Sequence, residues 1–127
     1  MRFVTAALTA AALAVSAGSA MAAPAHLNDS QFLAANRCLG LATSRSLAAP
    51  QDAAALRKLV HDQSFGRVGF VYDRGDELRD DAMHDADRAG SDLRVRLTAE
   101  RDGLCHSLVA MTSTTAAASQ GTPSSLR

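Results

Sequence analysis

A helical repeat of apolar residues over 64–89 constrains the fold of this chain more than any other feature of its sequence. Apolar or small residues recur there every three or four positions, at Val68, Val71, Tyr72, Gly75, Leu78, Ala82, Ala86 and Ala89. This spacing is typical of an amphipathic α-helix with one side turned toward a core. Because that side narrows to Gly and Ala toward its C-terminal half, the pattern also predicts a closely packed neighbouring helix.

Three further segments have helical patterns, so the sequence predicts a small all-α fold of four helices. We expect them near residues 29–44, 51–63, 66–89 and 92–111, joined by short connections into an antiparallel or irregular bundle. In the last helix one face gathers Leu93, Leu97, Leu104, Leu108 and Met111, which are predicted to be buried. The run RVGFVY at 67–72 is a short strand candidate, although the helical repeat passes through it.

The first 22 residues have the features of a secretory signal peptide. Arg2 precedes a short apolar run, and Ala20-Met21-Ala22 forms an A-x-A cleavage site. Cleavage after Ala22 is preferred to cleavage after Ala23, which would leave Pro24 next to the cut; an uncleaved N-terminal anchor is the alternative. The sequence therefore predicts an exported protein of the periplasm or extracellular space, with no integral membrane segment after cleavage.

The remaining chain is predicted to form one domain followed by a tail. About 105 residues can bury one modest core but not two. Residues 23–111 are the expected helical domain, and residues 112–127, rich in Ser, Thr and Ala, the expected disordered tail. Without Arg2, 12 basic residues face 13 acidic ones, and a net charge of −1 gives no attraction to nucleic acid or anionic membranes.

Cys38 and Cys105 are the only cysteines of the chain. Exported proteins meet an oxidising compartment, so the two are predicted to form a disulfide between the first and last helices. Closing a loop of this length would constrain the unfolded chain by roughly 4 kcal/mol. A redox-active pair is disfavoured, because the chain lacks the C-x-x-C spacing that tunes one thiol with another.

No catalytic or cofactor motif can be assembled from the spacing of the reactive residues. His106 follows Cys105, but Asp102 stands where the C-x-x-C-H haem motif requires its first cysteine. His26 and His61 have no Cys or His neighbours at ligand spacing. We therefore predict a protein that is not an enzyme and needs no cofactor. A small hydrolase whose site cannot be seen without the fold is the remote alternative.

Acidic residues form a row on the polar side of the segment 64–89. Asp73, Glu77, Asp81 and His84 stand three or four residues apart, so they are candidate ligands for a weakly bound divalent cation such as calcium. A single helix face cannot enclose a cation, however. A solvated charged surface is therefore the preferred interpretation.

Phe70 lies near this polar side and has two interpretations. It belongs to the core if the helix begins later or if residues 66–70 are irregular, which is the preferred one. Otherwise it is an exposed aromatic residue that contacts a partner. These features together predict a binding or envelope-stress accessory factor that acts through its surface on a protein partner, with weak metal binding as the alternative function.

Overall fold

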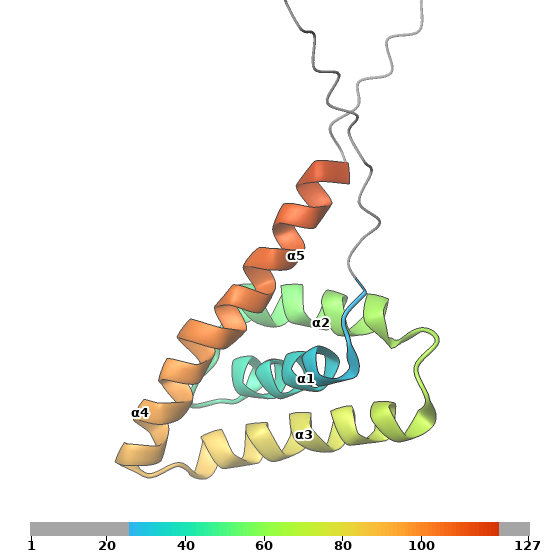
Figure 1. Cartoon of the computed structure of the whole chain (residues 1–127). Helices are drawn as coiled ribbons and strands as arrows, with labels where there is room; N and C mark the ends of the chain where they lie inside the picture. The colour runs from blue at the N-terminus through green and yellow to red at the C-terminus, as the bar shows by residue number, and fades with distance from the viewer. Residues whose placement is uncertain (1–25, 120–127) are drawn as a thin grey trace, which may run out of the picture.

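The computed structural model describes residues 26–119, and these residues form helices without any strand. The helices are α1 (Asp29–Thr43), α2 (Pro50–Ser64), α3 (Gly69–Arg88), α4 (Ser91–Glu100) and α5 (His106–Ser119). A π-helical turn, Arg101–Cys105, joins α4 to α5, so that the two form one long rod (Figure 1). The predicted small all-α fold is thus confirmed, whereas the predicted signal peptide lies outside the described residues.

Local sequence signals explain where the helices begin. Asn28 caps α1 through a reciprocal pair of hydrogen bonds: its Oδ1 accepts from the Gln31 N–H at 2.9 Å, and Gln31 Oε1 accepts from the Asn28 N–H at 3.0 Å. Pro50 is the first residue of α2, where its missing N–H leaves no hydrogen bond unmade. Gly66 has a φ of 79°, which α-helical residues do not adopt, and α3 therefore begins at Gly69 rather than at residue 66. The strand candidate 67–72 is consequently wrong, because this run is a connection followed by helix.

Helix α1 lies at the centre of the domain (Figure 1). Helix α2 returns antiparallel to it on one side, α3 runs along its other side, and the α4–α5 rod crosses the group obliquely. The arrangement explains why α1 is apolar on more than one side of its surface. Phe32 and Leu41 of α1 are among the largest fully buried side chains, together with Leu56 of α2.

Glycine and alanine bring α1 and α3 into close contact, as the narrow apolar side of α3 predicted. A Cβ atom at Gly40 would lie 2.1 Å from the backbone oxygen of Arg79 and 3.0 Å from the Ala82 Cβ. A Cβ at Gly75 would lie 2.9 Å from the Asn36 amide nitrogen. These distances are below van der Waals contact. A larger side chain at Gly40 would have to move a helix, because the atom it meets is backbone, whereas one at Gly75 would displace the side chain of Asn36.

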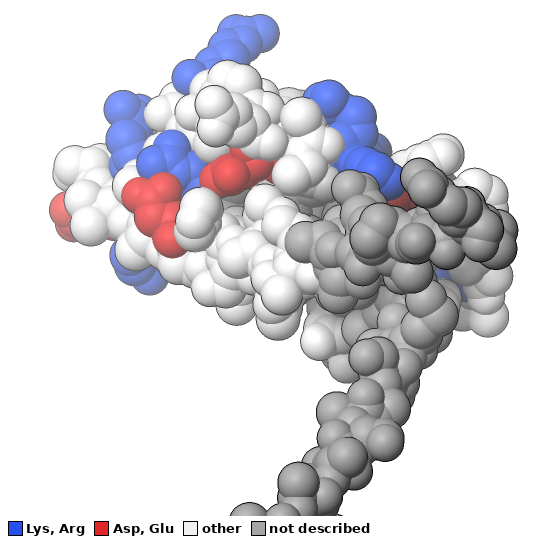
Figure 2. Space-filling view, turned by 90° about the horizontal axis from the view of Figure 1, so that it is seen from above, with Lys and Arg blue, Asp and Glu red and all other residues white. Residues whose placement is uncertain are grey.

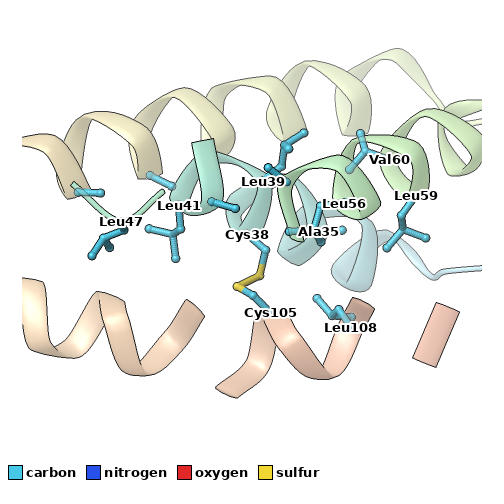
Figure 3. Close-up of a cluster of buried hydrophobic side chains, with 14 of the residues drawn as sticks. Ala35, Cys38, Leu39, Leu41, Leu47, Leu56, Leu59, Val60, Cys105 and Leu108 are labelled. Atoms are coloured by element: carbon cyan, nitrogen blue, oxygen red, sulfur yellow. A yellow bond between two sulfur atoms is a disulfide. The ribbon is translucent and has the colours of Figure 1, made fainter. Parts of the chain in front are cut away.

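The Cys38–Cys105 disulfide joins α1 to the long rod, confirming the predicted pairing, with a Cα–Cα distance of 5.4 Å. Both cysteines are fully buried among the core leucines rather than at the edge of an apolar face (Figure 3). Arg37 of α1 supports the junction by donating two hydrogen bonds, of 2.6 and 3.0 Å, to the Glu100 carboxylate. The guanidinium of Arg101 also donates to the Leu47 backbone oxygen at 2.9 Å.

The π-helical turn corrects the prediction for the last helix. Leu97 and Leu108 are buried and Leu93 is partly buried, as expected, but Leu104 and Met111 are half exposed. A π turn contains an extra residue, so it shifts the side chains that follow around the axis and turns Cys105 inward in place of Leu104. The sequence pattern assumed an unbroken period of 3.6 residues and could not anticipate this shift.

The rod also extends beyond its predicted end at residue 111. Helix α5 continues to Ser119, so the predicted disorder is wrong over residues 112–119, and residues 120–127 lie outside the described part of the chain. Alanine is the best helix former, and the run of alanines at 116–118 favours this continuation even without an apolar period.

Candidate functional site

Four large apolar residues are exposed where α2 passes into α3, within eight positions of the chain. Phe65 is 68% exposed, Val68 is 66% exposed and Phe70 is 79% exposed, while Tyr72 is about half exposed. We call these four residues the apolar loop surface. Clustered apolar exposure of this kind marks interaction sites in soluble proteins, whereas single exposed apolar residues are ordinary.

Arg67 holds this loop against the body of the domain. Its guanidinium stacks on the Phe32 ring, with 4.3 Å between Cζ and the ring centroid. It also donates to the backbone oxygens of Gln63 at 2.8 Å and Leu27 at 2.6 Å, and it forms an ion pair with Asp29. The Arg67 side chain is consequently only 4% exposed although it belongs to a surface connection.

The chain that precedes α1 completes the support beneath the loop. The Leu27 N–H donates to Gln63 Oε1 at 2.9 Å, so the start of the described chain is tied to the end of α2. On the loop itself, the Phe65 ring packs edge to face against His61, with 5.5 Å between ring centroids. The apolar side chains are thus exposed on a backbone that the contacts of Arg67 and the Leu27–Gln63 hydrogen bond hold in place.

A fixed backbone matters for binding because association is opposed by the entropy lost when a surface becomes ordered. Aromatic side chains that are already oriented can bury a large apolar area at a low further cost in entropy, and such residues dominate the energetics of protein interfaces. The apolar loop surface therefore has the composition and the rigidity of a binding surface.

The structure places the sequence-predicted residues of this region as follows. Phe70 is exposed, so its preferred assignment to the core is wrong and its alternative assignment to the surface holds. Val68 and Tyr72 were expected on the buried side, but Val68 precedes the first turn of α3, and burial begins at Val71. Phe65 was not anticipated as a surface residue; its only signal was its place in a connection punctuated by two glycines, Gly66 and Gly69.

The four candidate metal ligands, Asp73, Glu77, Asp81 and His84, are all exposed along α3. Glu77 forms an ion pair with Arg74 one turn away. Within residues 26–119 no three His, Cys, Asp or Glu side chains come together in an arrangement that could hold a metal ion. The weak cation site stays a prediction that this geometry does not support further.

Shifted pKa values occur at the junction of α1 with the rod and along the rod itself. The hydrogen bonds to Glu100 raise the pKa of Arg37, against the opposing effect of burial. The hydrogen bond between Arg101 and Asp102 raises the pKa of the arginine and lowers that of the exposed carboxyl group. Of these ion pairs only Arg37–Glu100 joins the rod to α1, since Arg101 and Asp102 are neighbours within the π turn, and none of the groups belongs to the apolar loop surface.

The remaining histidines belong to no group of metal ligands in the described part of the chain. His26 and His61 are exposed, and His106 is exposed with its Nδ1 3.8 Å from an Asp52 carboxylate oxygen.

No helix in the described part of the chain is both long enough and apolar enough to cross a membrane. Comparison with known proteins gives no significant match to any protein-family model, curated protein or solved structure.

Replacing Arg67 with methionine tests the support beneath the loop. We expect the Arg67→Met protein to lose about 2 kcal/mol of unfolding free energy, because the stacking on Phe32 is weakened and two backbone oxygens lose their donor. Amide hydrogen exchange should also accelerate over residues 65–70. Chemical denaturation and exchange mass spectrometry measure the two effects.

The matched control is Arg57→Met, because Arg57 is an exposed arginine on α2 with no ion pair among the described residues. It should change stability by less than about 0.5 kcal/mol. Equal effects of the two substitutions, or unchanged exchange in the loop of the Arg67 variant, would show that the loop does not depend on this arginine.

Proposed function

We propose that this protein is an exported, non-enzymatic binding protein that holds a partner protein through the apolar loop surface. The observation that carries the proposal is the exposure of Phe65, Val68 and Phe70 on a connection that the Arg67 side chain holds rigidly. An accessory role in the cell envelope, such as a response to envelope stress, fits a small disulfide-bonded protein of this kind.

Export has independent support from the chemistry of the chain. The buried disulfide between Cys38 and Cys105 suits an oxidising compartment, and the N-terminal residues 1–22 have the pattern of a cleavable signal peptide. Periplasm and extracellular space are both compatible with these features. A partner in either place would meet the folded, oxidised form of the protein.

The proposed contact can be tested by photocrosslinking in the producing cell. A benzophenone amino acid is placed at position 70 in the full-length protein, and the same amino acid is placed at position 95 as the control. Val95 is 70% exposed on α4, so it matches Phe70 in apolar exposure, whereas α4 meets the end of α3 that is opposite to Phe70 (Figure 1). We expect a discrete adduct from position 70 and none from position 95.

A second variant links the adduct to the apolar side chains themselves. Combining the probe at position 70 with Phe65→Ser and Val68→Ser should lower the adduct yield at least about tenfold, since interface residues of this type carry much of the binding energy. Equal adducts from positions 70 and 95, or a yield that survives both serine substitutions, would contradict the proposed function.

A further inference from the structure

The outer face of α3 continues the apolar loop surface as a row of charged residues. At about 100° per residue, Phe70 shares one face of the helix with Asp73, Glu77 and Asp81. All four are exposed, whereas Val71, Gly75, Ala82 and Ala86 face the core. An apolar anchor and a line of carboxylates therefore follow one another along this face, extending about 16 Å from Phe70 to Asp81 at the rise of an α-helix.

The negative charge of the domain is concentrated on this helix. Helix α3 contains seven carboxylates and three arginines, a net charge of −4. The face seen from above has a few Asp and Glu side chains beside several groups of Lys and Arg, so it is not predominantly acidic (Figure 2). The protein as a whole is close to neutral, so α3 is a local source of negative potential.

Some carboxylates of α3 have structural partners and others do not. Asp87 accepts from the backbone N–H groups of Arg45 and Ser46, and thereby fixes the connection after α1. By contrast, neither Asp73 nor Asp81 forms an ion pair within 4 Å among the described residues, although the charge of Asp81 contributes to raising the pKa of Arg37. These two carboxylates, one and three turns beyond Phe70, remain available to an incoming cation.

We infer that the partner presents a cationic amphipathic segment to this surface, an inference that rests on the proposed function. Apolar side chains of the segment pack on Phe65, Val68 and Phe70, and its Lys or Arg side chains lie over Asp73 and Asp81. Charge complementarity selects this partner, because the same carboxylates repel nucleic acid, anionic lipid and acidic peptides. A segment of about three helical turns matches the length of the surface.

The test uses two synthetic helical peptides of 14 residues and the mature, oxidised protein. One peptide has leucines at one end of a helical face and lysines along the rest of the same face; the second replaces every lysine with glutamate. Fluorescence anisotropy should show binding of the leucine–lysine peptide that weakens as salt is raised, and at least about tenfold weaker binding of the glutamate peptide.

Three single charge reversals locate the contact. Asp73→Lys and Asp81→Lys should each weaken binding of the leucine–lysine peptide at least about fivefold. Asp92→Lys, a reversal of an equally exposed aspartate at the start of α4, should leave it within about twofold. Circular dichroism establishes that each variant is folded before binding is compared.

Phe70→Ser tests the apolar part of the contact, and retained peptide binding in this variant would count against the inference. Loss of peptide binding in Phe70→Ser together with loss in the Asp73 and Asp81 variants supports the inference. It is overturned if the leucine–lysine peptide does not bind, if the glutamate peptide binds equally well, or if all three reversals behave alike. None of these results decides the proposed function, which is tested separately by comparing the crosslinked adducts from positions 70 and 95.

Discussion

Removing the disulfide by the double substitution Cys38→Ala, Cys105→Ala is expected to lower the Tm of the mature protein by about 20 °C. The bond closes a loop with a sequence separation of 67 residues, and its loss frees the unfolded chain by roughly 4 kcal/mol. This is a large share of the stability that a domain of this size can have.

The fold adds a reason for the size of this effect. Besides the disulfide, the contacts that hold the rod to the three-helix core include the packing of Leu97 and Leu108, the Arg37–Glu100 ion pair and the hydrogen bond from Arg101 to Leu47. Partly exposed ion pairs contribute little individually. We therefore expect the rod to detach first, and α1 to remain packed against α2 and α3.

Differential scanning calorimetry of the oxidised protein, the reduced protein and the double alanine variant measures the change in Tm. Reduction of the parent should reproduce the Tm of the variant, and reductant should leave the variant itself unchanged. A Tm within about 5 °C of the parent in the double variant would mean that the rod is held by its packing alone.

Gly40→Ala is expected to destabilise the domain by more than about 3 kcal/mol, although it adds a single methyl group. The added Cβ would lie 2.1 Å from the Arg79 backbone oxygen, which belongs to a helix and cannot rotate away. To relieve this clash, α1 and α3 would have to move apart along their contact. The buried residues around Ala82 would then lose packing.

Gly103→Ala is the matched control in the same protein. A Cβ at Gly103 has no atom within 4 Å, and alanine favours helix by about 1 kcal/mol over glycine, so this variant should be at least as stable as the parent. Urea denaturation of both variants measures the difference. A Gly40 variant as stable as the Gly103 variant would show that the two helices are not in the close contact described here.

Most of the helices of this protein can be predicted from local patterns. The capping residues Asn28 and Pro50 act on neighbouring residues of the chain, and the apolar repeat of α3 is visible in any window of the sequence. The disulfide could also be predicted, because export and a count of two cysteines leave one pairing. These features need no knowledge of which helix contacts which.

The candidate site was predicted only in part. Phe70 attracted attention because it falls outside the apolar repeat, but its exposure depends on which residues of α3 the other helices cover, and burial begins at Val71. The role of Arg67 has no local signal, because its partners Leu27, Asp29 and Phe32 are more than 30 positions away along the chain. The local sequence does not distinguish an exposed arginine from a buried one that holds a loop in place.

The sequence by itself determined the helical class, most helix starts and the pairing of Cys38 with Cys105, because capping, periodicity and residue counts act locally or through composition. Only the tertiary structure decided that the π turn at 101–105 turns Cys105 inward, that Gly40 meets the backbone of Arg79, and that the apolar loop surface stays exposed. Each of these depends on contacts between helices that are distant in the chain, and helical periodicity specifies a face without specifying what covers it.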